Sequence, residues 1–213
     1  MEIDTLTKAG LVARTLDTVD RDGKPAKRIT AARTYPTSVE DLWDAVTNID
    51  RIPRWFLPVT GDLHPGGRYQ LEGNAGGEVL ECEPPRRFEI TWEMGDDTSW
   101  VTVELTGDPG GDEAHLELRH VAHVPDEFWD QFGPGAVGVG WDGALVGLDL
   151  HVSSGKSVDP EEFRSWEATA EGAAFMRASS TAWAEAAIAA GVDPEVARGW
   201  EERVAAFYTP TEG

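Results

Sequence analysis

Residues 87–94, RFEITWEM, decide the fold class of this chain. Phe88, Ile90, Trp92 and Met94 alternate with charged or polar residues at every intervening position. Successive side chains of a β-strand point to opposite faces of a sheet, so this alternation predicts one apolar face and one solvated face. A sheet with one wet side is typical of antiparallel strands. The stretch therefore predicts an antiparallel sheet that packs on a core through one face.

The sequence on both sides of this strand extends the sheet. Between residues 60 and 124, short apolar runs such as WVTVEL and HLELRHVAHV are separated by Gly, Pro and Asp turn signals, which predicts an antiparallel meander. Nearer the N-terminus, Asp22 and Gly23 lie between two further runs, and an Asp-Gly pair favours the tight turn of a β-hairpin. We expect the strands of this hairpin near residues 11–19 and 26–35.

Two short helices are predicted between the hairpin and the meander. Ser38 can cap the first helix, because its hydroxyl can accept a hydrogen bond from a free backbone N–H of the first turn. The apolar residues that follow keep helical spacing until about Asn48. The second helix covers roughly residues 49–56 and ends before Pro58.

The longest helix is predicted after a Gly/Pro loop and runs to about residue 152. Its apolar stripe would lie over the sheet and consists of Val137, Trp141, Leu145, Leu148 and Val152. Four glycines interrupt this helix, and each costs about 1 kcal/mol relative to alanine in a helix interior. Either a close approach to the sheet or open space beside the helix would have to offset that cost.

The segment from residue 159 to residue 208 is rich in alanine and is predicted to be helical. Asp159 and Asp193 each precede a proline, the arrangement of an N-cap followed by proline at the first helical position. The middle helix of this segment carries a narrow apolar stripe of Phe175, Ser179, Trp183 and Ala187. We divide the chain into a domain of residues 1–155 and a helical C-terminal extension of residues 156–213.

The bulk composition excludes several classes of function. The 213 residues carry a formal net charge of −21, which would repel phosphate backbones and anionic lipid, so neither nucleic acid nor a membrane is an expected partner. Cys82 is the single cysteine and no signal-peptide pattern opens the sequence, which predicts a cytoplasmic protein. No cofactor is expected, because the Gly-rich stretch at residues 133–138 lacks the preceding buried strand of a nucleotide site. No metal is expected, because His120 and His123 would face opposite sides of a strand.

Two polar residues fall in apolar surroundings. His120 lies in the apolar phase of the last predicted strand, where it is either a satisfied interior histidine or a pocket residue that donates a hydrogen bond or transfers protons. Asp142 lies beside Trp141 in the longest predicted helix. Because carboxylates are mostly exposed, we expect Asp142 on a solvated face of that helix.

Three stretches resemble a known family. They are RTYPTSVEDLWDAVTNIDRIPRWFLP, GGRYQLEGNAGGEVLECEPPRRFEITWEM and GPGAVGVGWDGALVGLDLHV. Together they are similar to the SRPBCC superfamily of START-like domains and, within it, to the branch named after the activator of Hsp90 ATPase homologue. The shared motifs are an apolar-Trp pair, a Trp/Phe-Pro segment, a Gly-Gly-x-aromatic strand and a Gly-Trp helix, in that order. The resemblance covers about residues 30–152.

This resemblance implies an α+β helix-grip fold, in which a curved antiparallel sheet wraps around a long C-terminal helix and leaves a deep apolar cavity. The glycines of the long helix would then leave cavity volume. Trp55 and Phe56 are neighbours about 100° apart on a helix, so we expect one at the pocket, Trp55, and the other on the core. Carried onto this sequence, the cavity wall consists of Trp43, Trp55, Phe56, Tyr69, Trp92, Val103, His120, Trp141, Leu145 and Leu148.

Three functions stay open at this point. The leading hypothesis is a binding protein for a small apolar or aromatic molecule, because aromatic side chains usually line such pockets. An alternative, implied by enzymes of the superfamily, is a cyclase-, aromatase- or lyase-like catalyst with His120 and Tyr69 as acid and base. A third is a protein-interaction module that uses its acidic surface or its C-terminal helices, through which a homodimer could also form. Hsp90 activation is not implied, because nothing in the sequence resembles the separate domain that contributes to Hsp90 binding in the co-chaperone.

Overall fold

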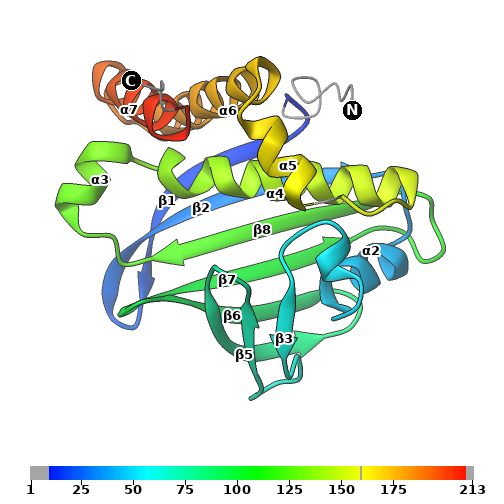
Figure 1. Cartoon of the computed structure of the whole chain (residues 1–213). Coiled ribbons are helices and arrows are strands. Elements are labelled where there is room, and N and C mark those ends of the chain that lie inside the picture. Colours follow the sequence, from blue (N-terminus) through cyan, green and yellow to red (C-terminus); the bar gives the residue numbers. More distant parts are fainter. Residues whose placement is uncertain (1–9, 159, 210–213) are drawn as a thin grey trace. The chain divides into compact units, whose positions relative to one another are not determined.

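The computed structural model describes residues 10–158 and 160–209, and Figure 1 shows the arrangement of its strands and helices. The strands are β1 (Ala13–Arg21), β2 (Lys24–Tyr35), β3 (Val59–Gly61), β4 (Arg68–Leu71), β5 (Gly76–Glu83), β6 (Arg87–Met94), β7 (Asp97–Thr106) and β8 (Ala114–Ala122). The helices are α2 (Val39–Thr47), the 3-10 turn η1 (Ile52–Arg54), α3 (Asp126–Phe132), α4 (Gly135–Ser154), α5 (Pro160–Glu167), α6 (Ala170–Ala189) and α7 (Pro194–Tyr208).

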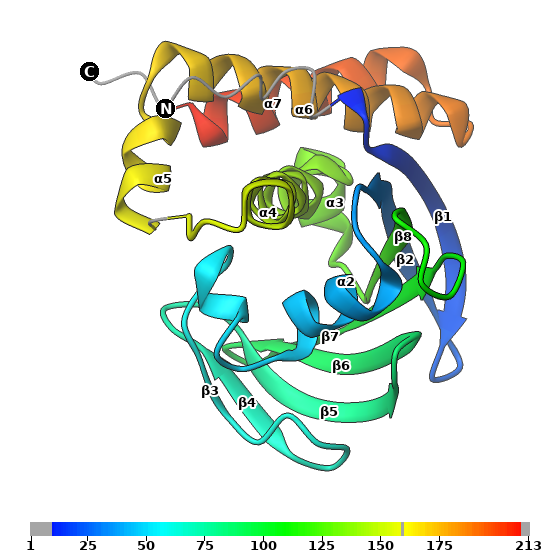
Figure 2. The same ribbon diagram turned by 90° about the vertical axis from the view of Figure 1, so that its right-hand side faces the viewer.

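The described strands form one sheet with the order β1-β2-β8-β7-β6-β5-β4-β3. From β3 to β8 every neighbouring pair is antiparallel, and the register of the central pair places Phe88 of β6 opposite Val103 of β7. Figure 2 shows how strongly the strands from β3 to β7 curve. The predicted meander and the predicted α+β helix-grip class are confirmed.

The N-terminal hairpin forms where the Asp-Gly pair predicts it. Asp22 and Gly23 join β1 to β2 with φ angles of 54° and 75°. Two consecutive residues in the left-handed region define the primed turn that matches the twist of a hairpin. Glycine adopts this region freely and aspartate tolerates it better than most residues.

The described residues divide into two compact units that alternate along the chain. The helical unit consists of residues 10–31, 123–146 and 161–209, and the sheet unit of residues 32–122, 147–158 and 160. The division falls inside β2 and inside α4, so each of these elements contributes to both units. The division of the sequence at residue 155 into a domain and an extension stays a prediction.

In the helical unit, α6 and α7 lie side by side (Figure 1). Their shared core consists of Ala184, Ala187, Ala197 and Trp200, against which Leu16 of β1 and Trp129 of α3 pack. The predicted apolar stripe of α6 is buried along its whole length. Asp193 caps α7 by accepting hydrogen bonds from two backbone N–H groups, as its position before proline predicts, whereas Asp159 lies outside the described residues.

In the sheet unit, α2 forms as predicted and the second helix is much shorter than predicted. Ser38 Oγ accepts a hydrogen bond from the Asp41 N–H at 3.2 Å, and α2 ends at the C-cap Asn48. The expectation of a helix over residues 49–56 is wrong, because η1 is a single turn of three residues. The backbone leaves the helical region at Trp55, where φ is −141°.

The glycines of α4 allow close approach at two positions. A Cβ at Gly138 would lie 2.3 Å from the Trp183 ring, and a Cβ at Gly147 would lie 2.7 Å from the Trp55 carbonyl oxygen. The expectation that these glycines leave cavity volume is wrong at both positions. At Gly140 and Gly143 the nearest atom to an added Cβ lies 3.7 Å away, so a methyl group would fit there.

Candidate functional site

An apolar cluster lies on the sheet unit beside η1. Its buried members are Val59, Tyr69 and Leu71, and the partly buried side chains that pack against them include Phe56, Ile90 and Trp92. Trp55 stacks on Phe56, with ring centroids 5.4 Å apart and planes inclined by 25°. The Trp55 Nε1–H donates to the Ala45 carbonyl at 2.8 Å. Phe56 thus belongs to the cluster, while Trp55 joins it to α2.

His120 is buried on β8 and belongs to a short polar chain. Its Nε2 lies 2.7 Å from Ser99 Oγ, and Ser99 Oγ donates to the Trp92 carbonyl at 3.1 Å. Since the hydroxyl proton is used on that carbonyl, the imidazole donates from Nε2 to Ser99. Burial lowers the pKa of His120 from 6.5 to about 4, so the ring is neutral at pH 7. His120 is therefore a satisfied interior histidine.

Tyr69, the second acid/base candidate, is also committed to a structural contact. Its hydroxyl donates to the Thr91 carbonyl at 2.7 Å, and burial raises the pKa of this phenol. Proton transfer by Tyr69 would require that hydrogen bond to break. The cyclase- or lyase-like alternative gains no support from either residue.

Eight of the ten predicted wall residues belong to the sheet unit and two, Trp141 and Leu145, belong to the helical unit. Tyr69, Val103, His120 and Leu148 are buried, and so are Trp141 and Leu145. Trp43, Trp55, Phe56 and Trp92 are half-buried, and Trp43 makes an edge contact with Phe88 at 6.1 Å. The role of the ten residues in ligand binding stays a prediction.

Asp142 contradicts the expectation of a solvated position. Its side chain is 0% exposed within the helical unit, and its carboxylate accepts from Arg14 Nε and Trp183 Nε1 at 3.0 Å and 3.1 Å, and from Ser179 Oγ. Arg14 Nη2 lies 3.0 Å from the same oxygen. Burial raises the pKa of the Asp142 carboxyl, and these donors oppose that rise. We call these four residues the Asp142 cluster.

Two more polar residues of α4 are buried in the sheet unit and were missed by sequence reasoning. Asp149 pairs with Arg33 Nη2 at 2.7 Å, and both side chains are less than 5% exposed. His151, 1% exposed, accepts from Arg51 Nε at 3.1 Å. A signal was present, because the residues around Asp142 and Asp149 on α4 are apolar or glycine on all sides, and a helix that is apolar all round is buried.

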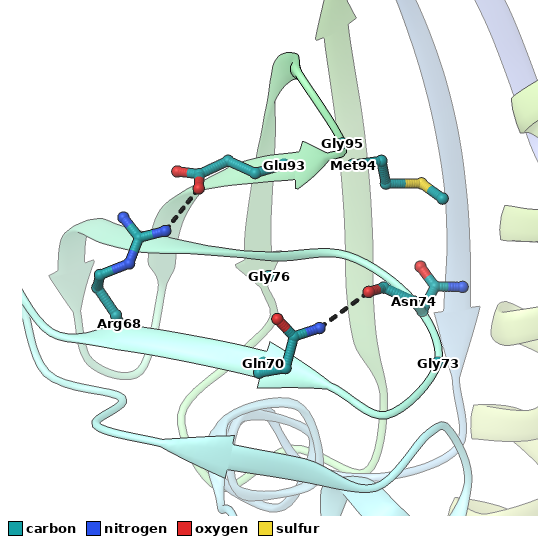
Figure 3. Close-up of a pocket in the computed structure, with 8 residues that line it drawn as sticks. All are labelled: Arg68, Gln70, Gly73, Asn74, Gly76, Glu93, Met94 and Gly95. Atoms are coloured by element: carbon teal, nitrogen blue, oxygen red, sulfur yellow. Dashed lines mark hydrogen bonds and ion pairs between the residues drawn. The ribbon is translucent and has the colours of Figure 1, made fainter.

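A polar hollow of about 370 Å³ lies at the tips of two hairpins of the sheet unit, and Figure 3 shows its lining. Arg68 Nη2 pairs there with Glu93 at 2.5 Å, and the Gln70 amide donates to the Asn74 carbonyl at 2.9 Å. These groups already satisfy one another, and none of the ten predicted wall residues lines the hollow. It is not the apolar site that the sequence predicts.

The part of the chain that the structure describes holds no cluster of three or more His, Cys, Asp or Glu side chains placed to bind a metal ion. Among its helices, none combines the length and the apolar character that a bilayer crossing requires.

The fold and the apolar cluster define a START-like helix-grip domain of the SRPBCC type. Residues 36–152 match the family model described as Activator of Hsp90 ATPase homolog 1-like protein, and the chain belongs to that family. The predicted family is thereby confirmed. A comparison with curated proteins yields no match.

Solved structures agree with this assignment. The crystal structure of CalU16 from Micromonospora echinospora is 32% identical, with a TM-score of 0.64, over 82% of this chain and 97% of that one. Its solution structure gives a TM-score of 0.67 at 31% identity over 84% of this chain and 96% of that one. Protein MLL2253 from Mesorhizobium loti is 25% identical with a TM-score of 0.51, over 59% of this chain and 96% of that one. Since CalU16 is matched over most of both chains, the similarity extends beyond the 36–152 segment.

Proposed function

We propose that this protein binds a small, flat, apolar or aromatic molecule on the sheet unit, against the apolar face of β6. Strand β6 has neighbours on both sides, yet none of its side chains is fully buried. Phe88, Ile90 and Trp92 are all half-buried, whereas Trp183 and Phe175 in the helical unit are 0% exposed. Apolar rings that stay partly open on a central strand are the observation that carries the proposal.

The chemistry of this surface favours a ligand with little charge. Aromatic and aliphatic side chains supply its area, and few polar groups are available to orient a ligand, which is how pockets for apolar molecules are usually lined. The nearest polar side chains, His120 and Tyr69, are bonded to Ser99 and to a backbone carbonyl. Membership of the family supports a cavity-bearing fold and leaves the ligand unnamed.

A panel of aromatic and polycyclic compounds, tested by thermal shift and native mass spectrometry, examines this proposal. The expected result is a saturable one-to-one complex that Trp92→Ala weakens about tenfold, the effect of losing roughly 1.4 kcal/mol of contact. Trp100→Ala is the matched control, because Trp100 is also half-buried and pairs with Thr91, which places it on the opposite face of the sheet from Trp92. Binding that Trp100→Ala abolishes and Trp92→Ala leaves intact would contradict the proposal, as would an absence of binding across the panel.

A second candidate function, protein interaction, is favoured by an exposed aromatic strip on the helical unit. Phe128 and Phe132 of α3 lie 5.2 Å apart, and Phe132 lies 5.8 Å from Phe207 of α7. Phe128 and Phe207 are 45% and 65% exposed. Asp126, Glu127 and Asp130 are exposed on the same helix as two of these rings, so the fitting occupant is a basic amphipathic segment of another protein, whose cations also suit aromatic faces.

The probe for this second function is a synthetic amphipathic Lys/Leu peptide, titrated calorimetrically at low and high salt. The double variant Phe128→Ser/Phe207→Ser should weaken binding about tenfold, a loss of roughly 1.4 kcal/mol. Val196→Ser, at a site 46% exposed on α7, should leave it unchanged. Light scattering on the same samples tests the homodimer expected from the sequence. If the chain forms a dimer and the double variant dissociates it, the occupant of the aromatic strip is a second copy of the chain and not a basic partner.

A further inference from the structure

Arg51 connects three elements of the sheet unit. It precedes η1, and its Nη1 donates to Asp41 Oδ1 at 2.8 Å and to Asp44 Oδ2 at 2.9 Å, both on α2. Its Nε donates to His151 Nε2 at 3.1 Å, near the C-terminal end of α4. The guanidinium therefore holds the start of η1 against both helices.

The contact with Arg51 fixes the protonation state of His151. A guanidinium can only donate hydrogen bonds, so His151 Nε2 must be an acceptor. His151 Nδ1 lies 2.7 Å from the Lys156 carbonyl, which can only accept, so Nδ1 carries the proton. Both ring nitrogens are thus satisfied by a neutral imidazole with its proton on Nδ1. A second proton, on Nε2, would direct an N–H and a positive charge at Arg51.

The same place is where η1 is fastened to the end of α4. Arg54 Nη2 donates to the Gly155 carbonyl at 2.7 Å, and the Val158 N–H donates to the Arg54 carbonyl at 2.7 Å. The Trp55 carbonyl lies so close to α4 that only glycine fits at position 147. These contacts place Trp55 and Phe56 directly after the fastened turn.

We propose that His151 and Arg51 form a proton-sensitive latch that holds η1, with Trp55 and Phe56, against the end of α4. When Nε2 carries a proton it has no lone pair left to accept from Arg51. Acidification therefore removes this hydrogen bond, and its loss releases η1. Histidine is the side chain whose charge ordinarily changes between pH 5 and 8.

The other charged groups around the imidazole do not provide this response between pH 7.5 and 5.5. The hydrogen bond from Arg51 lowers the pKa of Asp41, and the same donor lowers the pKa of Asp44, so both carboxylates stay ionised in that range. Lys156, whose carbonyl accepts from His151, has an exposed side chain. The proposed response therefore belongs to the Arg51–His151 contact.

The latch deepens the proposed function, because Trp55 and Phe56 border the proposed ligand surface and their release would regulate access to it. Its own test does not depend on any ligand. Hydrogen exchange of the amides of residues 51–57 is measured by mass spectrometry on the full ligand-free chain at pH 7.5 and 5.5, each corrected for the intrinsic exchange rate. We expect protection of this segment to fall about tenfold at the lower pH, because a proton on Nε2 removes the hydrogen bond from Arg51, and a hydrogen bond to a charged group is worth at least roughly tenfold in an equilibrium.

His151→Gln separates this proposal from a general loosening of the fold. A glutamine can accept from Arg51 and does not titrate, so protection should be equal at the two pH values. His115→Gln, on β8, is the matched histidine control and should keep the wild-type response. Should His151→Gln fail to fold, Arg51→Met gives the second test, because it opens the latch and should give low protection at both pH values.

Protection of residues 51–57 that does not change with pH in the wild-type chain would overturn the latch. So would a pH response that survives in both His151→Gln and Arg51→Met. Ligand binding measured at pH 7.5 reports on the proposed function alone, so binding without a pH response refutes the latch, whereas a pH response without binding refutes the function.

Discussion

The Asp142 cluster of the helical unit and the His151–Arg51 pair of the sheet unit bury a polar side chain on the same helix and meet it with an arginine. They differ in charge. Asp142 faces Arg14 as an anion, so the contact is an ion pair that two neutral donors complete. His151 faces Arg51 as a neutral acceptor. The first contact gains from the charge of the α4 residue, whereas the second exists only while that residue is uncharged.

This difference separates a permanent joint from a conditional one. A buried ion pair with its hydrogen bonds satisfied is costly to break, because the remaining partner is left as an uncompensated charge. An imidazole that fits in one protonation state can be released by a proton. Helix α4 thus carries a fixed joint to α6 and β1 in one unit, and a joint that responds to pH in the other.

The largest effect should come from removing the anion of the fixed joint. Asp142→Ala leaves the Arg14 guanidinium buried without its counter-charge, and we expect a loss of about 3–5 kcal/mol in the free energy of unfolding. Urea denaturation at pH 7 measures it. The double variant Arg14→Met/Asp142→Leu should recover only part of the loss. Removing both ions eliminates the uncompensated charge, but the buried donors Ser179 and Trp183 lose their acceptor. A loss below about 1 kcal/mol in Asp142→Ala would show that this ion pair is as weak as a typical surface pair. The Asp142–Arg14 contact would then not be a fixed joint, and its difference from the His151–Arg51 contact would disappear.

The contacts of the Asp142 cluster and of the His151–Arg51 pair could not be predicted from the sequence. The alternation of β6, the Asp-Gly turn and the Ser38 cap act between near neighbours, so the sequence was enough to predict the sheet, the hairpin and α2. The partners of Asp142 lie 128 and 37 positions away, at Arg14 and Ser179. Arg51 lies 100 positions from His151. No local pattern records such pairs, and a lone carboxylate on a helix is most often exposed, which led to the wrong expectation for Asp142.

Half-burial along β6 could not be predicted for a related reason. An apolar strand face reads the same in the sequence whether it is covered by a core or left open for a ligand, because both need apolar side chains. The alternation therefore identified Trp92 as inward-facing without deciding what covers it. For η1, the helix predicted over residues 49–56 ends early because the backbone leaves the helical region at Trp55.

A second histidine tests whether burial alone, without a facing cation, makes stability depend on pH. The pKa of His120 is about 4 in the folded protein, below its ordinary value of 6.5. Between these two pH values the unfolded chain therefore binds more protons than the folded chain. The contribution of His120 to the free energy of unfolding is complete above pH 6.5 and is lost as the pH falls to about 4, a change on the order of 3 kcal/mol.

Urea denaturation at pH 7 and pH 4.5 measures this effect, and His120→Gln should remove it. The variant is made in a His151→Gln background, so that opening of the latch does not contribute to the slope. If the free energy of unfolding still falls with pH after His120→Gln in that background, desolvation of His120 is not the cause. Burial alone would then not explain the pH dependence.

The smallest effects should come from two glycines of α4 that lie two residues apart. An added Cβ at Gly138 would lie 2.3 Å from the Trp183 ring, whose Nε1 is bonded to Asp142. The ring cannot retreat without loosening the fixed joint, so Gly138→Ala should cost about 1–3 kcal/mol. At Gly140 the nearest atom is 3.7 Å away, so Gly140→Ala should stabilise the protein by about 1 kcal/mol through helix propensity.

The two variants should change stability in opposite directions, and the measurement is the difference between their urea denaturation midpoints. Helix propensity favours alanine equally at both positions, so it cancels from the comparison and leaves the cost of displacing Trp183. If Gly138→Ala proves as stabilising as Gly140→Ala, the Trp183 ring moves freely and its hydrogen bond does not fix it. The Asp142 cluster would then yield to a single methyl group, and the rigid joint that distinguishes it from the His151–Arg51 latch would not exist.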